Sequence, residues 1–226
     1  MLDYLKLLDY AKLAYTNHES YDNIFRLTFE SVDNGVDYYI GIRENTLLLS
    51  FRGTDEILDV ITDLHFWQKE VPSYESCENN PVKIKVHSGF YNAYNNPKVK
   101  DEIRKYIGGD IREIYVTGHS YGAALALLCA SDLQYAYPNL HFEVVVFGCP
   151  RIGNKAWEIE YSKRLINTVR FENGNDLVTK IPFAIMGFRH TRFKIHIGKA
   201  RMPLVYSLSQ HDINAYRASF CVDGIC

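Results

Sequence analysis

The hydrophobic and polar positions of the first fifty residues predict one helix followed by three strands. Apolar residues recur at helical spacing over residues 2–15, which indicates an amphipathic helix that packs on a sheet. Stretches rich in β-branched and aromatic residues then predict strands at residues 25–31, 37–43 and 46–51. Only Glu44 and Asn45 separate the last two strands, so we expect them to form a hairpin.

The rest of the chain alternates between helix and strand patterns. The pattern predicts helices at residues 56–64, about 88–106, 123 to about 137, 157–164 and about 211–220. It predicts strands at residues 83–86, 114–117, 142–147, 166–171 and 193–197, whereas residues 66–74 have the mixed polarity of a loop. Strands that alternate with helices favour a largely parallel sheet with antiparallel edges. Because no repeat or linker interrupts the series, we expect residues 1–226 to form one α/β domain.

One turn in this series has an unusual sequence. The segment Gly118-His119-Ser120-Tyr121-Gly122 joins an apolar strand pattern to an Ala- and Leu-rich helix pattern. The bare G-x-S-x-G pattern is a weak signal, because it arises by chance in on the order of one chain in ten of this length. Between a strand and a helix, however, it indicates a nucleophile elbow, a strained turn that exposes the serine oxygen. The two glycines would let strand and helix approach closely, so Ser120 is a candidate nucleophile.

Composition and charge exclude some partners. Of the 226 residues, 47% are hydrophobic and 23% are charged, which is ordinary for a globular protein. The formal net charge of -2 and the lack of a dense Lys/Arg run argue against nucleic acid as a partner. No apolar run is long enough to cross a bilayer. Nothing in the sequence predicts the oligomeric state.

The N-terminal residues do not predict export. The first ten residues mix acids with leucines, which is unlike a signal peptide. We therefore expect either a protein that works inside the cell or a secreted one whose leader this sequence does not include.

The cysteines suggest neither a metal site nor a cofactor site. There are five, at Cys77, Cys129, Cys149, Cys221 and Cys226, and their spacing is unlike that of zinc sites. Cys129 and Cys149 lie in predicted core elements, where we expect small buried hydrophobic side chains. Cys221 and Cys226 bracket a short loop and could close as a disulfide or remain two thiols. We expect no metal and no cofactor.

Two further residues complete a possible catalytic set with the serine. A serine hydroxyl needs a base to take its proton, and the base needs an acid to orient it. In a doubly wound sheet, these groups should follow the carboxyl ends of strands. Asp176 follows the strand that ends at Phe171, and His211 begins the final helix. The chain order Ser120, Asp176, His211 is the order that the elbow scaffold uses.

Other interpretations of the acid stay open on the sequence alone. Asp176 could simply cap a turn, because Gly-Asn-Asp is typical of turns. Glu172, Asp212 and Asp223 are rival acids, although they lie respectively in a strand end, beside the candidate base and in the tail.

Three other histidines compete with His211 or need an explanation. His196 has the position of a strand residue, and a lone strand histidine is more often a satisfied core or surface group. His190 is the other rival. His119 is adjacent to the serine, so the turn should direct it elsewhere, and we expect a structural role. His211 is preferred because it lies at a loop-to-helix junction after the acid.

Acyl transfer also needs donors aimed at the developing oxyanion, and losing one costs about 3 to 4 kcal/mol. The elbow itself supplies the backbone N–H of Tyr121. The loop Phe51-Arg52-Gly53-Thr54-Asp55, after an earlier strand, could supply the N–H and hydroxyl of Thr54. The alternative is an ordinary strand exit in which Thr54 caps a helix.

Five segments together resemble the successive signatures of the class 3 lipases, which are the fungal-type triacylglycerol lipases and their relatives. The matches run in order from about residue 40 to His211, over most of the chain. The segments are Phe-Arg-Gly-Thr at 51–54, Val-His-Ser-Gly-Phe-Tyr at 86–91, Thr-Gly-His-Ser-Tyr-Gly-Ala-Ala-Leu-Ala at 117–126, Phe-Gly-Cys-Pro-Arg-Ile-Gly-Asn at 147–154 and Asn-Asp-Leu-Val-Thr-Lys-Ile-Pro at 175–182.

The resemblance implies a fold and a set of site residues. The fold is that of the α/β-hydrolases, in which a mostly parallel central sheet has helices on both faces and antiparallel N-terminal strands. The resemblance implies Ser120 as nucleophile, Asp176 as orienting acid and His211 as base. It also implies Thr54 and Tyr121 at the oxyanion hole.

The resemblance also implies a lid from Asp55 to about Asp63. The lid and the loop that follows it together span residues 55–80. The apolar inner face of the lid would include Ile57, Leu58, Val60, Ile61 and Leu64. A fixed helix packed over the sheet is the alternative. The matching motif histidine, His87, is expected to be structural. Ala123 departs from the family by replacing a second glycine, which is a mild steric change.

The segment after the candidate acid suggests where an acyl chain would bind. Residues 181–188 are apolar enough to line an acyl slot, with Phe183, Ile185 and Phe188 as candidates. Four acids near the lid would repel strongly anionic surfaces, which favours neutral acylglycerols or small esters over acidic phospholipids.

The sequence therefore predicts a metal-free carboxylic ester hydrolase that cleaves acylglycerols through an acyl-enzyme intermediate. We expect a lipid or small ester as substrate and transient contact with a lipid interface. Two alternatives stay open: a feruloyl esterase or phospholipase of the same family, and a catalytically silent binding protein that keeps the scaffold.

Overall fold

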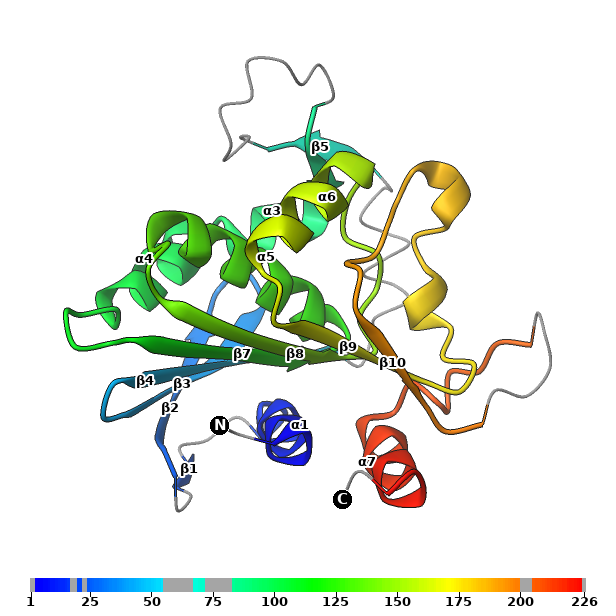
Figure 1. The fold of residues 1–226 in the computed structure, drawn as a ribbon, viewed down its shortest axis with the longest axis horizontal. Helices are drawn as coiled ribbons and strands as arrows, with labels where there is room; N and C mark the ends of the chain where they lie inside the picture. Colours follow the sequence, from blue (N-terminus) through cyan, green and yellow to red (C-terminus); the bar gives the residue numbers. More distant parts are fainter. Residues whose placement is uncertain are drawn as a thin grey trace.

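The strands of the protein form a sheet that changes from antiparallel to parallel along its width (Figure 1). The computed structural model describes residues 3–16, 20–21, 24–54, 67–71, 83–199 and 205–224. In this part of the chain, the strand order is β1-β2-β3-β4-β7-β8-β9-β10. The strands are β1 (Ser20–Tyr21), β2 (Arg26–Val32), β3 (Val36–Arg43), β4 (Thr46–Phe51), β7 (Glu113–His119), β8 (His141–Phe147), β9 (Thr168–Asn173) and β10 (Lys194–Ile197).

Pairing in the sheet follows the order of the chain. Strands β1 to β4 pair antiparallel, and the predicted hairpin at Glu44 and Asn45 joins β3 to β4. From β4 onward, β7, β8, β9 and β10 pair parallel. The carboxyl ends of these parallel strands therefore meet at one edge, where loops from distant parts of the chain come together.

Helices cover both faces of the sheet (Figure 1). On one face lie α3 (Ser88–Tyr94), α4 (Pro97–Lys105), α5 (Tyr121–Ala136) and α6 (Lys155–Arg164). On the other lie α1 (Tyr4–Leu13) and α7 (Ile213–Val222). The expected mostly parallel sheet, with antiparallel N-terminal strands and helices on both sides, is confirmed.

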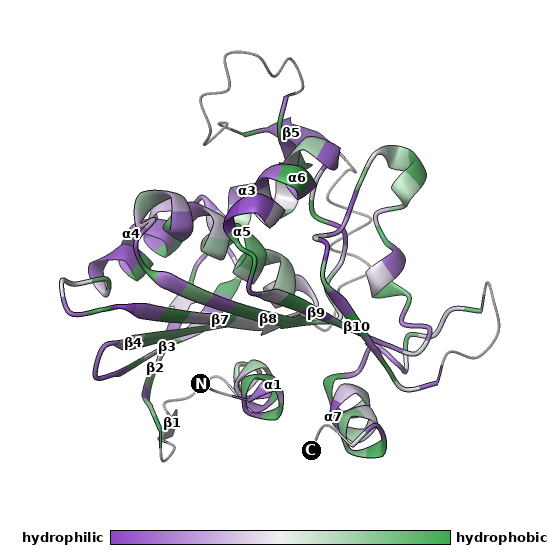
Figure 2. Cartoon of the chain, in the orientation of Figure 1, coloured by the Kyte–Doolittle hydropathy of each residue, from purple (hydrophilic) through white to green (hydrophobic). Residues whose placement is uncertain are grey.

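The buried hydrophobic residues form two clusters, one on each face of the sheet. This division arises because successive side chains of a strand point to opposite faces. In β4, Leu47 and Leu49 belong to the cluster under α5, whereas Leu48 belongs to the cluster under α1, and all three are fully buried. Figure 2 shows hydrophobic residues along the central strands and in α5, which lies against them. Burying each leucine stabilises the fold by roughly 1.5–3 kcal/mol. An unbroken apolar run is thus what a strand between two helical layers requires.

The single helix predicted over residues 88–106 is wrong, because it consists of two helices. Helix α3 ends at Tyr94. Helix α4 begins at Pro97, and the Asn96 side chain accepts a hydrogen bond from the Lys98 backbone N–H as its N-cap. Proline suits the first turn of a helix but lacks the N–H that a helix interior needs, so the chain restarts there.

The stretch predicted as a loop at residues 66–74 contains a strand. β5 (Gln68–Glu70) pairs antiparallel with β6 (Lys85–His87) in a separate two-stranded sheet. Three polar residues carry no alternation that could have revealed it, since the pairing itself creates the strand.

Some sequence predictions fall outside the described residues or differ slightly from the structure. The proposed lid residues Ile57, Leu58, Val60 and Ile61 lie in the segment 55–66, outside the described residues. Helix α7 begins at Ile213 and not at His211, because the Asp212 carboxylate accepts from the Asn214 N–H and caps the helix there.

The cysteines of the described residues differ in state. Cys129 and Cys149 are buried free thiols, whereas Cys221 is disulfide-bonded. Cys77 and Cys226 lie outside the described residues. Within those residues, no helix has the length and apolar character that crossing a membrane requires.

Candidate active site

Ser120 lies in a strained turn between β7 and α5. Its backbone has φ 59° and ψ -124°, a conformation that a residue with a side chain rarely adopts. A Cβ atom at Gly118 would lie 2.5 Å from the carbonyl oxygen of Gly122, so strand and helix touch through backbone here. This is the close approach expected of the two glycines, and it turns the serine hydroxyl toward the carboxyl edge of the sheet.

His211 connects Ser120 to Asp176. The His211 Nδ1 is 2.9 Å from Asp176 Oδ2, and its Nε2 is 2.8 Å from Ser120 Oγ. A carboxylate only accepts hydrogen bonds, so Nδ1 carries the proton and Nε2 accepts from the serine hydroxyl. All three residues are buried, with His211 8% exposed. The structure therefore brings the three predicted side chains together in the geometry that activates a nucleophile.

Tyr216 is a partner of Asp176 that the sequence interpretation missed. Its hydroxyl donates to Asp176 Oδ2 over 2.6 Å, while the Asn173 backbone N–H donates to the tyrosine oxygen. The other carboxylate oxygen accepts from the Val178 N–H over 2.8 Å. These donors fix the orientation of the carboxylate toward His211. The signal available in the sequence was the position of Tyr216 on the helix that follows His211.

Gly148 leaves the room that the His211 ring needs. It has φ 58°, and a Cβ atom at this position would lie 2.8 Å from His211 Cε1 and 3.2 Å from Asp176 Oδ2. A glycine therefore has to follow strand β8 at this point. In the sequence, Gly148 marked only the end of a buried strand.

The loop with Thr54 lies against the serine turn. Phe51 pairs with Gly118 in the sheet. A Cβ atom at Gly122 would lie 2.2 Å from the Phe51 carbonyl oxygen, so the strand exit presses on the start of α5. Tyr121 is the first residue of α5. The backbone N–H groups of the first turn of a helix have no hydrogen-bond acceptor within the helix, so they can donate to another group. The two residues predicted for the oxyanion hole thus lie on adjoining backbone segments.

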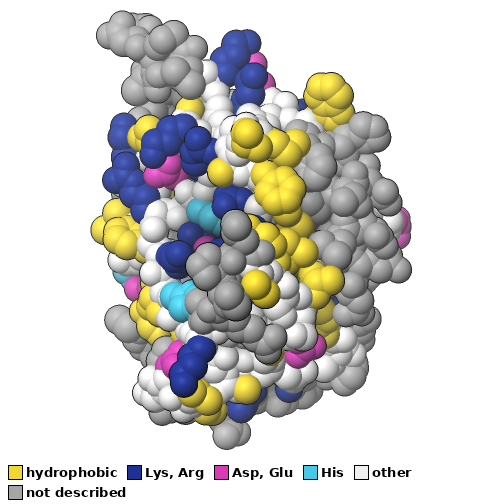
Figure 3. Space-filling model, turned by 90° about the vertical axis from the view of Figure 1, so that its right-hand side faces the viewer, with side chains coloured by type: hydrophobic (Ala, Val, Ile, Leu, Met, Phe, Trp, Pro, Cys, Tyr) yellow, Lys and Arg dark blue, Asp and Glu magenta, His cyan; other side chains and the backbone are white. Residues whose placement is uncertain are grey.

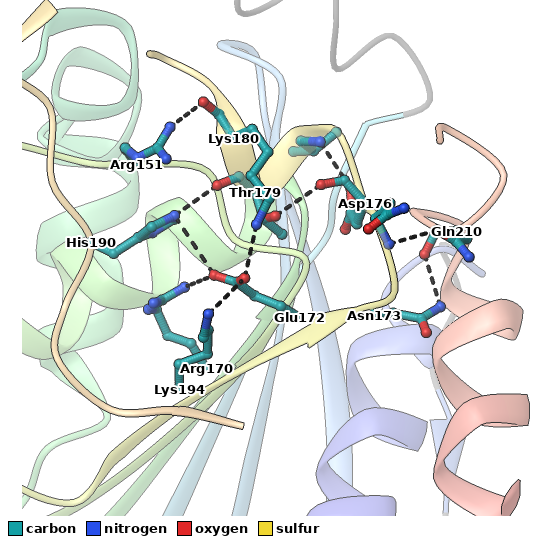
Figure 4. Close-up of polar contacts among 12 residues, drawn as sticks. Arg151, Arg170, Glu172, Asn173, Asp176, Thr179, Lys180, His190, Lys194 and Gln210 are labelled. Atoms are coloured by element: carbon teal, nitrogen blue, oxygen red, sulfur yellow. Dashed lines mark hydrogen bonds and ion pairs between the residues drawn. The ribbon is translucent and has the colours of Figure 1, made fainter. Parts of the chain in front are cut away.

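The buried carboxylate of Glu172 forms ion pairs at the end of β9, just before Asp176 (Figure 4). Glu172 accepts from Arg170 over 2.9 Å and from Lys180 over 3.1 Å, and Lys194 Nζ lies 3.5 Å away. Burial alone would raise the pKa of Glu172, but the positive charges of Arg170 and Lys180 lower it to about 2. Glu172 is therefore committed to this ion cluster and is unavailable to His211.

Side chains from neighbouring segments and from the loop itself hold the loop after Asp176 (Figure 4). Arg151 donates to the Lys180 carbonyl, and His190 Nε2 donates to the Thr179 carbonyl over 2.7 Å. The Thr179 hydroxyl in turn donates to the Asp176 carbonyl over 2.9 Å. Asp176 is thus part of a fixed loop and not merely a turn cap.

The remaining rivals have other roles. Asp212 caps α7, and Asp223 accepts from the Gly198 N–H. His196 is exposed on β10, and burial lowers the pKa of His190 well below its usual value, with Arg170 adding to the effect. His119, expected to be structural, contacts His211: the two rings stack at 4.6 Å between centroids.

The three acyl-slot candidates lie in different environments. Phe188 is fully buried, 5.9 Å from the ring of His87. Phe183 is 49% exposed and Ile185 is 95% exposed. Because the Ile185 side chain is almost fully exposed, the described residues do not enclose it, and its place in an acyl slot stays a prediction. His87, also expected to be structural, is fully buried and stacks on Phe90.

Within the described residues, no group of three or more His, Cys, Asp or Glu side chains could hold a metal ion. What the site contains is an alcohol, an imidazole and a carboxylate in hydrogen-bond contact, beside backbone N–H groups at a helix start.

Comparison with known proteins gives consistent matches. The family described as Lipase (class 3) matches residues 48–186. A lipase of Rhizopus niveus is 30% identical over 175 residues, which cover 72% of this chain and 42% of that protein. A chloroplastic phospholipase A(1) of Arabidopsis thaliana is 28% identical over 156 residues, which cover 62% of this chain and 34% of that protein. The chain thus spans less than half the length of these two relatives.

A solved structure is similar over most of the chain. It is that of a triacylglycerol lipase whose catalytic centre is a serine protease triad. The TM-score is 0.65 at 27% identity, and the match covers 85% of this chain and 79% of that one.

Proposed function

Because this chain belongs to the class 3 lipase family, we propose that it is a serine hydrolase that cleaves carboxylic esters of lipids. The observation that carries this proposal is the unbroken hydrogen-bond chain from Asp176 through His211 to Ser120, with distances of 2.9 and 2.8 Å. Those two contacts are what a serine hydroxyl needs to become an attacking alkoxide near neutral pH.

In the proposed mechanism, Ser120 Oγ attacks the ester carbonyl carbon while His211 Nε2 takes the hydroxyl proton. The carbonyl oxygen becomes an oxyanion, which the backbone N–H of Tyr121 and the N–H and hydroxyl of Thr54 would stabilise. The carbon–oxygen ester bond then breaks, and His211 gives its proton to the leaving alcohol. Water hydrolyses the acyl-enzyme by the same steps, with His211 again acting as base.

We propose acylglycerols as the substrate class. The support is the similarity to lipases, together with exposed apolar residues close in sequence to Asp176. A phospholipid substrate is the second candidate, since a phospholipase A(1) is among the relatives. A feruloyl ester substrate and a catalytically silent scaffold are the remaining alternatives.

One set of assays separates these candidates. The purified protein is expected to be labelled by a fluorophosphonate probe, which reacts with activated serines, and to release fatty acid from mono- and triacylglycerol emulsions. Parallel assays use phosphatidylcholine, methyl ferulate and a chain-length series of p-nitrophenyl esters. Preference for phospholipid or ferulate would replace the acylglycerol assignment. Absence of both labelling and turnover would support the alternative of a catalytically silent protein that keeps the scaffold.

An exposed apolar turn that follows Asp176 in the sequence is a further part of the proposal. Phe183 and Met186 are 49% and 39% exposed, and Ile185 between them is 95% exposed, at the 3₁₀ turn η2 (Ala184–Met186). Figure 3 shows the side of the molecule where this turn lies, with hydrophobic side chains beside Lys and Arg side chains. Because exposed apolar clusters are costly in water, we propose that this turn contacts the lipid surface that supplies the substrate.

Replacing Ile185 with aspartate is expected to weaken binding to phosphatidylcholine vesicles about tenfold or more, because burial of an isoleucine is worth roughly 1.5–3 kcal/mol. Turnover of a soluble short-chain ester should stay unchanged. The measurement is vesicle sedimentation together with both assays.

The matched control is Ile166→Asp, since Ile166 is 66% exposed and precedes the amino end of β9, away from the site. Equal loss of vesicle binding in the two variants would contradict a role for this turn.

A further inference from the structure

His119 is hydrogen-bonded through both ring nitrogens. Its Nε2 is 2.8 Å from the backbone carbonyl oxygen of His211, and its Nδ1 is 2.7 Å from the hydroxyl oxygen of Tyr15. Its ring also stacks on the ring of His211, with an angle of 28° between the planes. His119 is therefore in contact with the backbone and the side chain of the proposed base.

These contacts fix which nitrogen of His119 carries the proton. A backbone carbonyl only accepts, so Nε2 must be the N–H donor toward His211. Burial, with the neighbouring His211 as the second cause, lowers the pKa of His119 well below its usual value, so the ring is neutral. A neutral imidazole has one N–H, and Nδ1 is then an acceptor. The Tyr15 hydroxyl is consequently the donor to Nδ1.

The Tyr15 hydroxyl lies where three parts of the site meet. Tyr15 follows α1, far from the others in sequence. A Cβ atom at Gly53 would lie 2.1 Å from the Tyr15 hydroxyl oxygen and 2.7 Å from the His119 carbonyl oxygen. Gly53 immediately precedes Thr54. The hydroxyl thus touches the loop of the proposed oxyanion hole and the residue before Ser120, and through His119 it reaches His211.

We propose that Tyr15 is a positioning residue for the proposed reaction, which it serves by holding the ring of His119 through Nδ1 and thereby fixing the position of His211. This inference rests on the proposed function. Without the hydroxyl, His119 Nδ1 is buried with no donor. Moving the proton to Nδ1 gives no relief, because Nε2 would then turn a lone pair toward the His211 carbonyl oxygen, which repels it. The unpaired Nδ1 therefore favours a displaced His119 ring, which loosens the stacked pair of rings on which the approach to Ser120 depends.

Tyr15→Phe is expected to lower kcat for a soluble p-nitrophenyl ester about tenfold, with KM unchanged, because displacement of a catalytic group acts on the chemical step. The same substitution made in a His119→Gln background should cause no further loss, since Tyr15 acts through His119. Tyr39→Phe is the matched control: the Tyr39 hydroxyl lies 3.2 Å from Thr16 Oγ1 at the same end of α1.

A readout independent of activity comes from the ¹⁵N chemical shifts of the histidine rings. His119 should show the Nε2–H tautomer in the parent protein and in Tyr15→Phe, whereas the ¹⁵N shift of its Nδ1 should move to that of an acceptor without a donor in the variant alone, with unchanged circular dichroism. A parent protein that lacks esterase activity would overturn the proposed function, and the Nδ1 shift would still report on the link. Parent-like kcat in Tyr15→Phe, additive losses in the double variant, or an unchanged Nδ1 shift would each overturn the inference.

Discussion

Ser120→Ala is expected to lower kcat for a p-nitrophenyl ester by at least about four orders of magnitude, which leaves only the residual rate that substrate binding and the oxyanion hole provide. The substitution removes the only atom that would form the acyl bond, and no other hydroxyl in the described residues is hydrogen-bonded to His211 Nε2. Labelling by a fluorophosphonate should disappear together with turnover. The measurement is initial rate against substrate concentration for the variant and the parent.

The fold should survive this change. Ser120 already adopts a positive φ, and alanine and serine experience similar backbone strain there. Circular dichroism and the thermal midpoint are therefore expected to stay close to those of the parent. Ser31→Ala is a suitable control, because the Ser31 hydroxyl lies on β2 and donates to Asp37. Full activity in Ser120→Ala would remove the proposed mechanism.

Asp176→Asn is expected to lower kcat by roughly three to four orders of magnitude while leaving substrate binding nearly unchanged. An amide oxygen has less negative charge than a carboxylate, so it stabilises the imidazolium of His211 poorly. The amide nitrogen is also a donor, and if it faces Nδ1 it selects the tautomer with a protonated Nε2. That tautomer cannot take the proton of Ser120.

Asp212→Asn is the matched control for this acid. Asp212 is next to His211 in sequence, but its carboxylate caps α7, and asparagine caps a helix equally well. Near-parent kcat is expected for this variant, with kcat and KM measured as for Asp176→Asn. Similar losses in the two variants would show that general charge near His211, and not the contact with Nδ1, matters.

The serine turn could be predicted because its signal is local. A strand, two glycines and a helix follow one another within a few residues, and the strain at Ser120 arises from those same residues. The acid and the base could be selected through chain order and strand ends, and the structure places His211 within hydrogen-bond distance of both partners. The contact between Asp176 and His211, which lie far apart in the chain, was expected only because the carboxyl ends of parallel strands meet at one edge of the sheet.

Other features had no local signal. Glu172 ranked as a rival acid until its burial among cations became visible. Ile185 had the composition of a slot residue, yet the turn exposes it. β5 pairs with β6 through backbone contacts that three polar side chains do not reveal. In each case the deciding quantity was burial or pairing, which depends on how distant segments are packed.

By itself, the sequence determined the order of strands and helices, the special turn at Ser120 and the short set of acids and bases that could serve it. Only the tertiary structure decided which residues support that set: Tyr216 on Asp176, Gly148 beside the His211 ring, and Tyr15 on His119. Periodicity and turn chemistry are properties of neighbouring residues and can be read along the chain. A hydrogen bond between residues a hundred positions apart depends on sheet register and helix docking, which exist only once the chain has folded.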